Sequence, residues 1–168
     1  KFGTKLVIYN KDILEIDETV LFNEKLTVFG NLPYNISTEI LSKWIINLKN
    51  DIWFDSLILM FQKEVANRII AQSNTSEYGR LSILCNWRLE VRKICDIKPE
   101  AFFPKPKIDS SLLFFLPKKN FFRLKDSKSL EIVTRIFFNQ RRKMIKNPLR
   151  QIFQDPEKIA NKLKLNIN

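Results

Sequence analysis

The sequence predicts an α/β fold that is followed by a small all-helical unit. Up to residue 117, short β-favouring runs alternate with segments whose apolar residues recur at helical spacing. The run 57–61 is continuously apolar, as a strand buried on both faces must be. After Ser127 only the helical pattern remains. We therefore expect an α/β domain over residues 1–117 and a helical domain over residues 118–168.

The expected strands are runs of β-favouring residues bounded by turn residues. The first ends at the polar turn 10–12, and the second ends at Gly30. Residues 89–97 alternate apolar and polar side chains, which is typical of a strand with one exposed face. Prolines then indicate an irregular stretch over 99–106. The expected strands are residues 6–9, 26–29, 57–61, 89–97 and 108–116.

The expected helices also have local signals. Ser37 is a candidate helix cap before an apolar pattern of helical spacing. The polar residues 73–78 predict a loop between two further helices, and Asp155-Pro156 marks the start of the last one. The expected helices are residues 37–48, 64–71, 81–87, 127–137, 144–153 and 159–165.

The predicted sheet is small for the apolar surface it carries. Two or three parallel strands make a poor core, and apolar edge strands invite aggregation. We therefore expect more sheet before residue 1 in the natural protein. The alternative is that the antiparallel strands at the end of the sheet close it alone.

The net charge of +11 is concentrated in one segment. Residues 117–150 hold 11 basic and 2 acidic residues, whereas residues 1–116 are nearly balanced. Such clustering favours a polyanionic partner, and nucleic acid fits better than a membrane because the segment has no wide free apolar face. The alternative is a solvated helix face.

The composition excludes several chemistries. With no His, the chain has no Ser-His-Asp triad and no imidazole metal ligand. Cys85 and Cys95 are too few for a four-thiolate zinc site, and we interpret them as buried thiols of a cytoplasmic protein. The three glycines are scattered, so no Gly-rich phosphate loop exists. No apolar run approaches the length of a membrane span.

The segment Gly30–Ser37, GNLPYNIS, carries the most specific chemistry. It follows a buried strand and precedes a helix, where open α/β sheets bind ligands. The Asn31 side-chain oxygen and the Leu32 carbonyl would accept the two N–H groups of an adenine amine and aim its lone pair at an electrophilic methyl. Pro33 stiffens the loop, and Tyr34 offers a ring for base stacking. The alternative is an ordinary strand-to-helix turn.

This segment resembles the adenine-binding motif of the small-subunit ribosomal RNA adenine dimethyltransferases. Four further segments resemble motifs of that family in the same order, so the resemblance runs over nearly the whole chain. They are residues 61–65 with Arg68, residues 78–82, residues 101–110, and residues 138–143 with Asn147 and Leu149.

The resemblance implies a partial Rossmann-like methyltransferase sheet, with its front half missing, and S-adenosylmethionine as methyl donor without a metal. Asn31, Leu32, Pro33 and Tyr34 would form the catalytic loop. Asp12 falls where the family's carboxylate accepts from the adenine amine of the cofactor, and Asn31 would touch both cofactor and target. For Asp12 the alternative is a turn residue at a strand end.

The resemblance also implies a ribosomal RNA substrate. Tyr34 would stack on one face of a flipped adenine and Phe102 would cover the other, while Phe103 departs from the small polar residue usual there. A basic cluster would hold RNA phosphates. It comprises Arg141, Arg142, Lys143 and Lys146. The alternative for Phe102 is an ordinary position in the hydrophobic core. We assign no functional role to Lys63 and Glu64.

The implied function is dimethylation of adenine N6 in small-subunit ribosomal RNA by a monomer during ribosome maturation. The cofactor-binding front of the family would lie before residue 1, so the chain alone is expected to bind cofactor poorly. Three alternatives remain: a non-catalytic RNA-binding assembly factor, a large-subunit ribosomal RNA adenine methyltransferase, and an organellar relative that acts in transcription.

Overall fold

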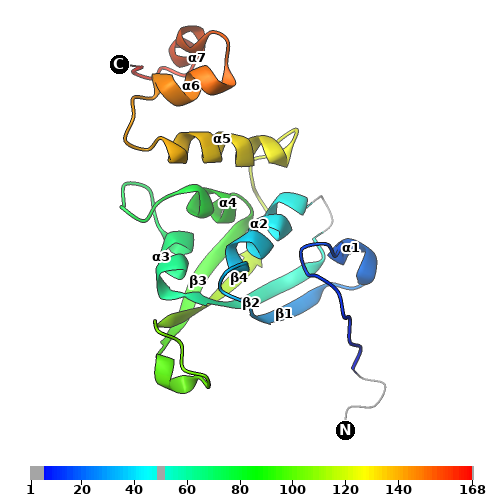
Figure 1. The fold of residues 1–168 in the computed structure, drawn as a ribbon. Coiled ribbons are helices and arrows are strands. Elements are labelled where there is room, and N and C mark those ends of the chain that lie inside the picture. The colour runs from blue at the N-terminus through cyan, green and yellow to red at the C-terminus, as the bar shows by residue number, and fades with distance from the viewer. Residues whose placement is uncertain (1–5, 49–51, 168) are drawn as a thin grey trace.

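The computed structural model describes residues 6–48 and 52–167. Its α/β part is built on a four-stranded mixed sheet, which Figure 1 draws as arrows. The strand order is β1-β2-β4-β3. β1 and β2 are parallel, and β4 runs antiparallel to both of its neighbours. Four of the five predicted strands are therefore confirmed. They are β1 Leu26–Asn31, β2 Phe54–Gln62, β3 Leu89–Ile97 and β4 Ser110–Pro117.

Three helices, α2, α3 and α4, lie between the sheet and the C-terminal helices (Figure 1). Their bounds are Ser37–Asn47, Lys63–Ile70 and Arg80–Arg88. All three agree with the predicted segments. Alternate residues of β2 point into the core, so Leu57, Leu59 and Phe61 are fully buried. Ile40 and Leu41 of α2 are buried in the same core cluster.

The segment before β1 differs from the prediction. Residues 6–9 are not a strand, and their side chains are 45% exposed or more. A β-favouring run gains its ladder hydrogen bonds only from a neighbouring strand, and none of the described strands pairs with this one. The sequence also did not reveal α1, the short helix Glu18–Leu21.

Helix α1 is tied to α2 by a buried carboxylate. Glu18 is 7% exposed, and its Oε1 accepts hydrogen bonds from Lys43 Nζ at 3.0 Å and from Trp44 Nε1 at 2.7 Å. Two donors from successive residues of α2 satisfy the charge that burial would otherwise penalise. The contact fixes the chain that leads into β1.

The C-terminal part is helical, as predicted. It contains α5 Ser127–Asn139, α6 Lys146–Ile152 and α7 Pro156–Lys162, and Pro156 begins α7. The segment between β4 and α5 is anchored to the end of α4: the guanidinium of Arg88 lies 3.8 Å from the ring centroid of Phe121. Trp87 Nε1 donates to the Phe122 carbonyl at 2.6 Å. α5 packs on α2 and α4.

The two cysteines have different environments. Cys85 is buried, and burial raises the pKa of its thiol. Cys95 is exposed on β3, so the prediction that both thiols are buried is wrong for Cys95. The outward-facing side of an edge strand places it in solvent. Among the residues that the structure describes, no helix has the length and apolar character needed to cross a membrane.

Candidate functional site

The candidate site centres on the bend between β1 and α2. Gly30 lies against β2, where a Cβ would approach Leu59 Cδ2 to 2.6 Å. Because residue 30 has no side chain, the end of β1 can lie close to β2. The bend is then held by the Ile36 amide, which donates to the Pro33 carbonyl at 3.2 Å. The Ser37 hydroxyl donates to the Tyr34 carbonyl at 3.1 Å.

Ser37 acts differently from the prediction. It is the first residue of α2, and Ile36 occupies the capping position. The side chain of Ser37 is buried and bonds backward into the bend instead of to an amide of the helix. Its contribution is to fix the position of Tyr34.

The four predicted catalytic residues lie together on this bend. Asn31 and Pro33 are exposed, whereas Leu32 and Tyr34 are partly buried. An exposed amide and a half-buried aromatic ring on the same bend suit a planar base that is stacked on one face and hydrogen-bonded at one edge. These roles remain predictions.

A buried serine holds the tyrosine ring. The hydroxyl groups of Tyr34 and Ser110 are 2.6 Å apart, and Ser110, the first residue of β4, is fully buried. The two residues are 76 positions apart in sequence, so no local pattern could predict the contact. This hydrogen bond links the bend to the base of the loop that carries Phe102.

We call residues 98–109, which join β3 to β4, the aromatic loop. It begins with a 3-10 turn over Pro99–Ala101. Phe102 is partly buried, whereas Phe103 is fully exposed, at 102% of the reference area. Of the two rings, Phe102 is therefore the one that is seated in the protein. Its proposed contact with a target base remains a prediction.

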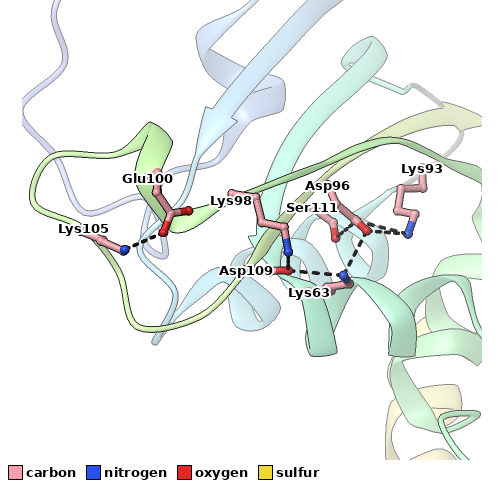
Figure 2. Close-up of polar contacts among 8 residues, drawn as sticks. All are labelled: Lys63, Lys93, Asp96, Lys98, Glu100, Lys105, Asp109 and Ser111. Atoms are coloured by element: carbon pink, nitrogen blue, oxygen red, sulfur yellow. Dashed lines mark hydrogen bonds and ion pairs between the residues drawn. The ribbon is translucent and has the colours of Figure 1, made fainter.

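Ion pairs close the base of the aromatic loop (Figure 2). Asp109 Oδ2 lies 2.9 Å from Lys98 Nζ and 3.4 Å from Lys63 Nζ, and Lys63 Nζ also lies 3.3 Å from Asp96 Oδ2. The backbone repeats the connection, because the Lys63 amide donates to the Asp109 carbonyl at 2.9 Å. Lys63, to which the sequence analysis assigned no role, thus joins the start of α3 to Asp96 of β3 and to Asp109 at the end of the loop.

The pKa values reflect this cluster. A hydrogen bond from Ser111, with further support from Lys93 and Lys63, holds the pKa of Asp96 at about 2. Lys98 and then Lys63 lower the pKa of Asp109. Hydrogen bonds to Asp96 and Asp109 raise the pKa of Lys63. Each carboxylate is therefore charged and paired at neutral pH.

Asp12 lies in a turn, which is the alternative that the sequence left open. Its Oδ1 accepts from the Leu14 amide at 2.8 Å, and its carbonyl accepts from the Glu15 amide at 3.1 Å. A carboxylate has capacity for further donors, and the exposed Asp12 lines an open cavity of about 660 Å³. The residue therefore still fits the adenine amine of a cofactor, and that role remains a prediction.

The predicted basic cluster divides into two kinds of residue. Arg141 donates to the Ser76 and Thr75 carbonyls at 2.6 and 3.1 Å, and Lys146 Nζ lies 2.8 Å from Glu157 Oε1. Arg142 and Lys143 are exposed in the turn after α5. Arg142 and Lys143 are therefore the better candidates for contacts with RNA phosphates.

A groove of about 900 Å³ lies beside Arg141, between the sheet-covering helices and α5. Its walls combine aromatic and charged side chains, which include Tyr78, Phe138, Arg68, Glu39 and Lys128. Among residues 6–48 and 52–167, no group of three or more candidate ligand side chains is placed to hold a metal ion.

Comparison with known proteins identifies relatives over the whole chain. The family model described as ribosomal RNA adenine dimethylase matches residues 1–168. The ribosomal RNA small subunit methyltransferase A of Pelagibacter ubique (strain HTCC1062) is 61% identical over all 168 residues, which cover 64% of that protein. The protein of the same name from Wolbachia sp. subsp. Drosophila simulans (strain wRi) is 41% identical over 166 residues, which cover 98% of this chain and 59% of that one.

Solved structures show the same fold. A dimethyladenosine transferase from Plasmodium falciparum superposes with a TM-score of 0.66 at 26% identity, over 94% of this chain and 57% of that one. The 23S rRNA methyltransferase ErmE superposes with a TM-score of 0.59 at 18% identity, over 95% of this chain and 63% of that one. This chain therefore spans about three fifths of the length of the proteins it resembles.

Proposed function

The chain belongs to the ribosomal RNA adenine dimethylase family, and from this premise we propose that the protein of which it forms part methylates adenine N6 in small-subunit ribosomal RNA. S-adenosylmethionine would supply an activated methyl group. The observation that carries the proposal is the bend after β1, which holds an exposed Asn31 and, three residues later, a Tyr34 whose hydroxyl is hydrogen-bonded to Ser110.

The chain's contribution to the reaction is positioning. The Asn31 side-chain oxygen and the Leu32 carbonyl would accept the two N–H groups of the target adenine, which would leave the nitrogen lone pair free to point out of the ring plane. Tyr34 stacks on the base and holds that geometry. Asp12 would hold the cofactor by accepting from its adenine amine.

The RNA contact belongs to the C-terminal helices. Arg142 and Lys143 are exposed and project from the most basic part of the sequence, so they would neutralise RNA phosphates. Target access requires an adenine that is unstacked from its neighbours, which a single-stranded loop provides most easily. The names of the relatives support small-subunit RNA as the substrate.

The test of this function is Tyr34→Ala in the whole protein. We expect methyl transfer to small-subunit ribosomal RNA to fall at least about 100-fold, because the target base loses its stacking surface. RNA affinity should fall far less than methyl transfer, because phosphate contacts supply most of it. The readout is transfer of a labelled methyl group, with filter binding of the same RNA measured in parallel.

Phe122→Ala is the matched control, since this exposed ring lies on the segment after β4 and outside the bend. Full methylation by Tyr34→Ala would contradict the stacking role. RNA binding by a whole protein that transfers no methyl group would instead favour the non-catalytic assembly factor.

A further inference from the structure

The side chain of Phe103 lies entirely in solvent, at 102% of its reference area. Its neighbour Phe102 is partly buried, so the two adjacent rings have different surroundings. Single exposed apolar residues are ordinary on protein surfaces. Phe103 differs from most because the loop that presents it is braced.

Four contacts hold the aromatic loop in shape. Lys98 and Asp109 close its base at 2.9 Å, and Glu100 and Lys105 bridge its middle at 2.5 Å (Figure 2). The Ala101 amide donates to the Lys98 carbonyl at 3.0 Å, and the Phe102 amide donates to that of Pro99 at 3.2 Å. A braced loop presents the ring in a defined direction and leaves less conformational entropy to lose on binding.

The charge around the ring favours an anionic partner. Of the three lysines on this loop, Lys98 and Lys105 pair with Asp109 and Glu100, whereas the exposed Lys107 has no ion pair among the described residues. Aromatic rings beside cationic side chains are the usual means of binding unpaired nucleotides, because the ring stacks on a base while the cations attract the backbone. The loop is followed directly by Ser110, whose hydroxyl bonds to that of Tyr34. The base of the loop therefore lies beside the bend proposed to receive the target adenine.

We propose that Phe103 stacks on an unpaired nucleotide of the RNA substrate other than the target adenine. The ring thereby adds a contact that helps to select a single-stranded target site. This inference rests on the proposed function, because it takes ribosomal RNA as the ligand. It assigns binding, and not catalysis, to Phe103.

The test compares Phe103→Ser, Phe103→Trp and the wild type in the whole protein. The probe is a single-stranded RNA oligonucleotide of the target region in which 2-aminopurine replaces bases next to the target adenine. We expect Phe103→Ser to weaken binding by about fivefold or more, and to abolish the 2-aminopurine quenching at one position. Phe103→Trp should retain both the RNA affinity and the quenching of the wild type. These variants should fold like the wild type, because the Phe103 side chain is fully exposed and does not pack in the core.

Phe122→Ser removes another exposed ring, 77% exposed, and should leave both readouts unchanged. Equal RNA affinity for Phe103→Ser and the wild type would overturn this inference and leave the proposed function standing. A change in sedimentation with unchanged RNA affinity would assign the ring to a second copy of the chain, and would also overturn it. A wild type that binds no RNA would overturn the proposed function together with this inference.

Discussion

The hydrogen bond between Tyr34 and Ser110 makes a testable contribution to stability. Tyr34→Phe and Ser110→Ala should each lower the free energy of unfolding by about 1 kcal/mol or more, because each removes the bond. Tyr34→Phe leaves the fully buried Ser110 hydroxyl without its partner, and Ser110→Ala leaves the half-buried Tyr34 hydroxyl without its partner. The double variant should lose no more than the larger single loss. Urea denaturation of the four proteins measures this coupling. Ser129→Ala, in the exposed first turn of α5, is the control, and additive losses would contradict a direct bond.

The paired carboxylate of Asp96, near the end of β3, predicts that the stability of the protein is sensitive to acid. The pKa of Asp96 is lowered from 3.8 to about 2 in the fold, so its carboxylate stabilises the protein fully above about pH 4. That contribution is lost as the pH falls toward 2. The thermal unfolding midpoint of the wild type should therefore drop across this range, and that of Asp96→Asn should drop less steeply. Asp55→Asn, at an exposed position of β2, should follow the wild type.

Elements that depend on local pattern were predictable, and contacts across the sheet were not. The alternation in β3 and the apolar run in β2 specify strands because their own side chains define the buried faces. Residues 6–9 are also β-favouring, but none of the described strands pairs with them. Propensity alone therefore predicted a strand wrongly. The bend of the site was recognisable as a motif. Two supporting contacts were not recognisable: Ser110 bonds to Tyr34 of the bend, and Lys63 pairs with Asp109 of the aromatic loop. Only the register of β2 against β4 brings these partners together.

At the scale of the whole molecule, a few polar contacts seat the basic helices on the α/β part. Arg80 pairs with Glu131 of α5, and the Ser127 hydroxyl donates to the Ile46 carbonyl of α2 at 2.8 Å. Arg141 bonds to the 73–78 loop instead of projecting freely. The sequence grouped Arg141 with Arg142 and Lys143 by adjacency, whereas the fold gives Arg141 an intramolecular contact.

Because Arg141 is engaged within the protein while Arg142 and Lys143 are exposed, the proposed binding of RNA by the whole protein should depend on salt through Arg142 and Lys143. Replacing both Arg142 and Lys143 by Gln should reduce the slope of log K against log salt by about 1.4 in magnitude, because two contacts with a single-stranded backbone are lost. Lys158→Gln with Lys162→Gln removes the same charge from exposed positions on α7 and should change the slope less. Arg141→Gln should instead lower stability, because the Ser76 carbonyl loses its guanidinium donor and the Thr75 carbonyl keeps only the Tyr78 amide. Equal slopes for the two double variants would mean that net charge, and not this turn, attracts the RNA.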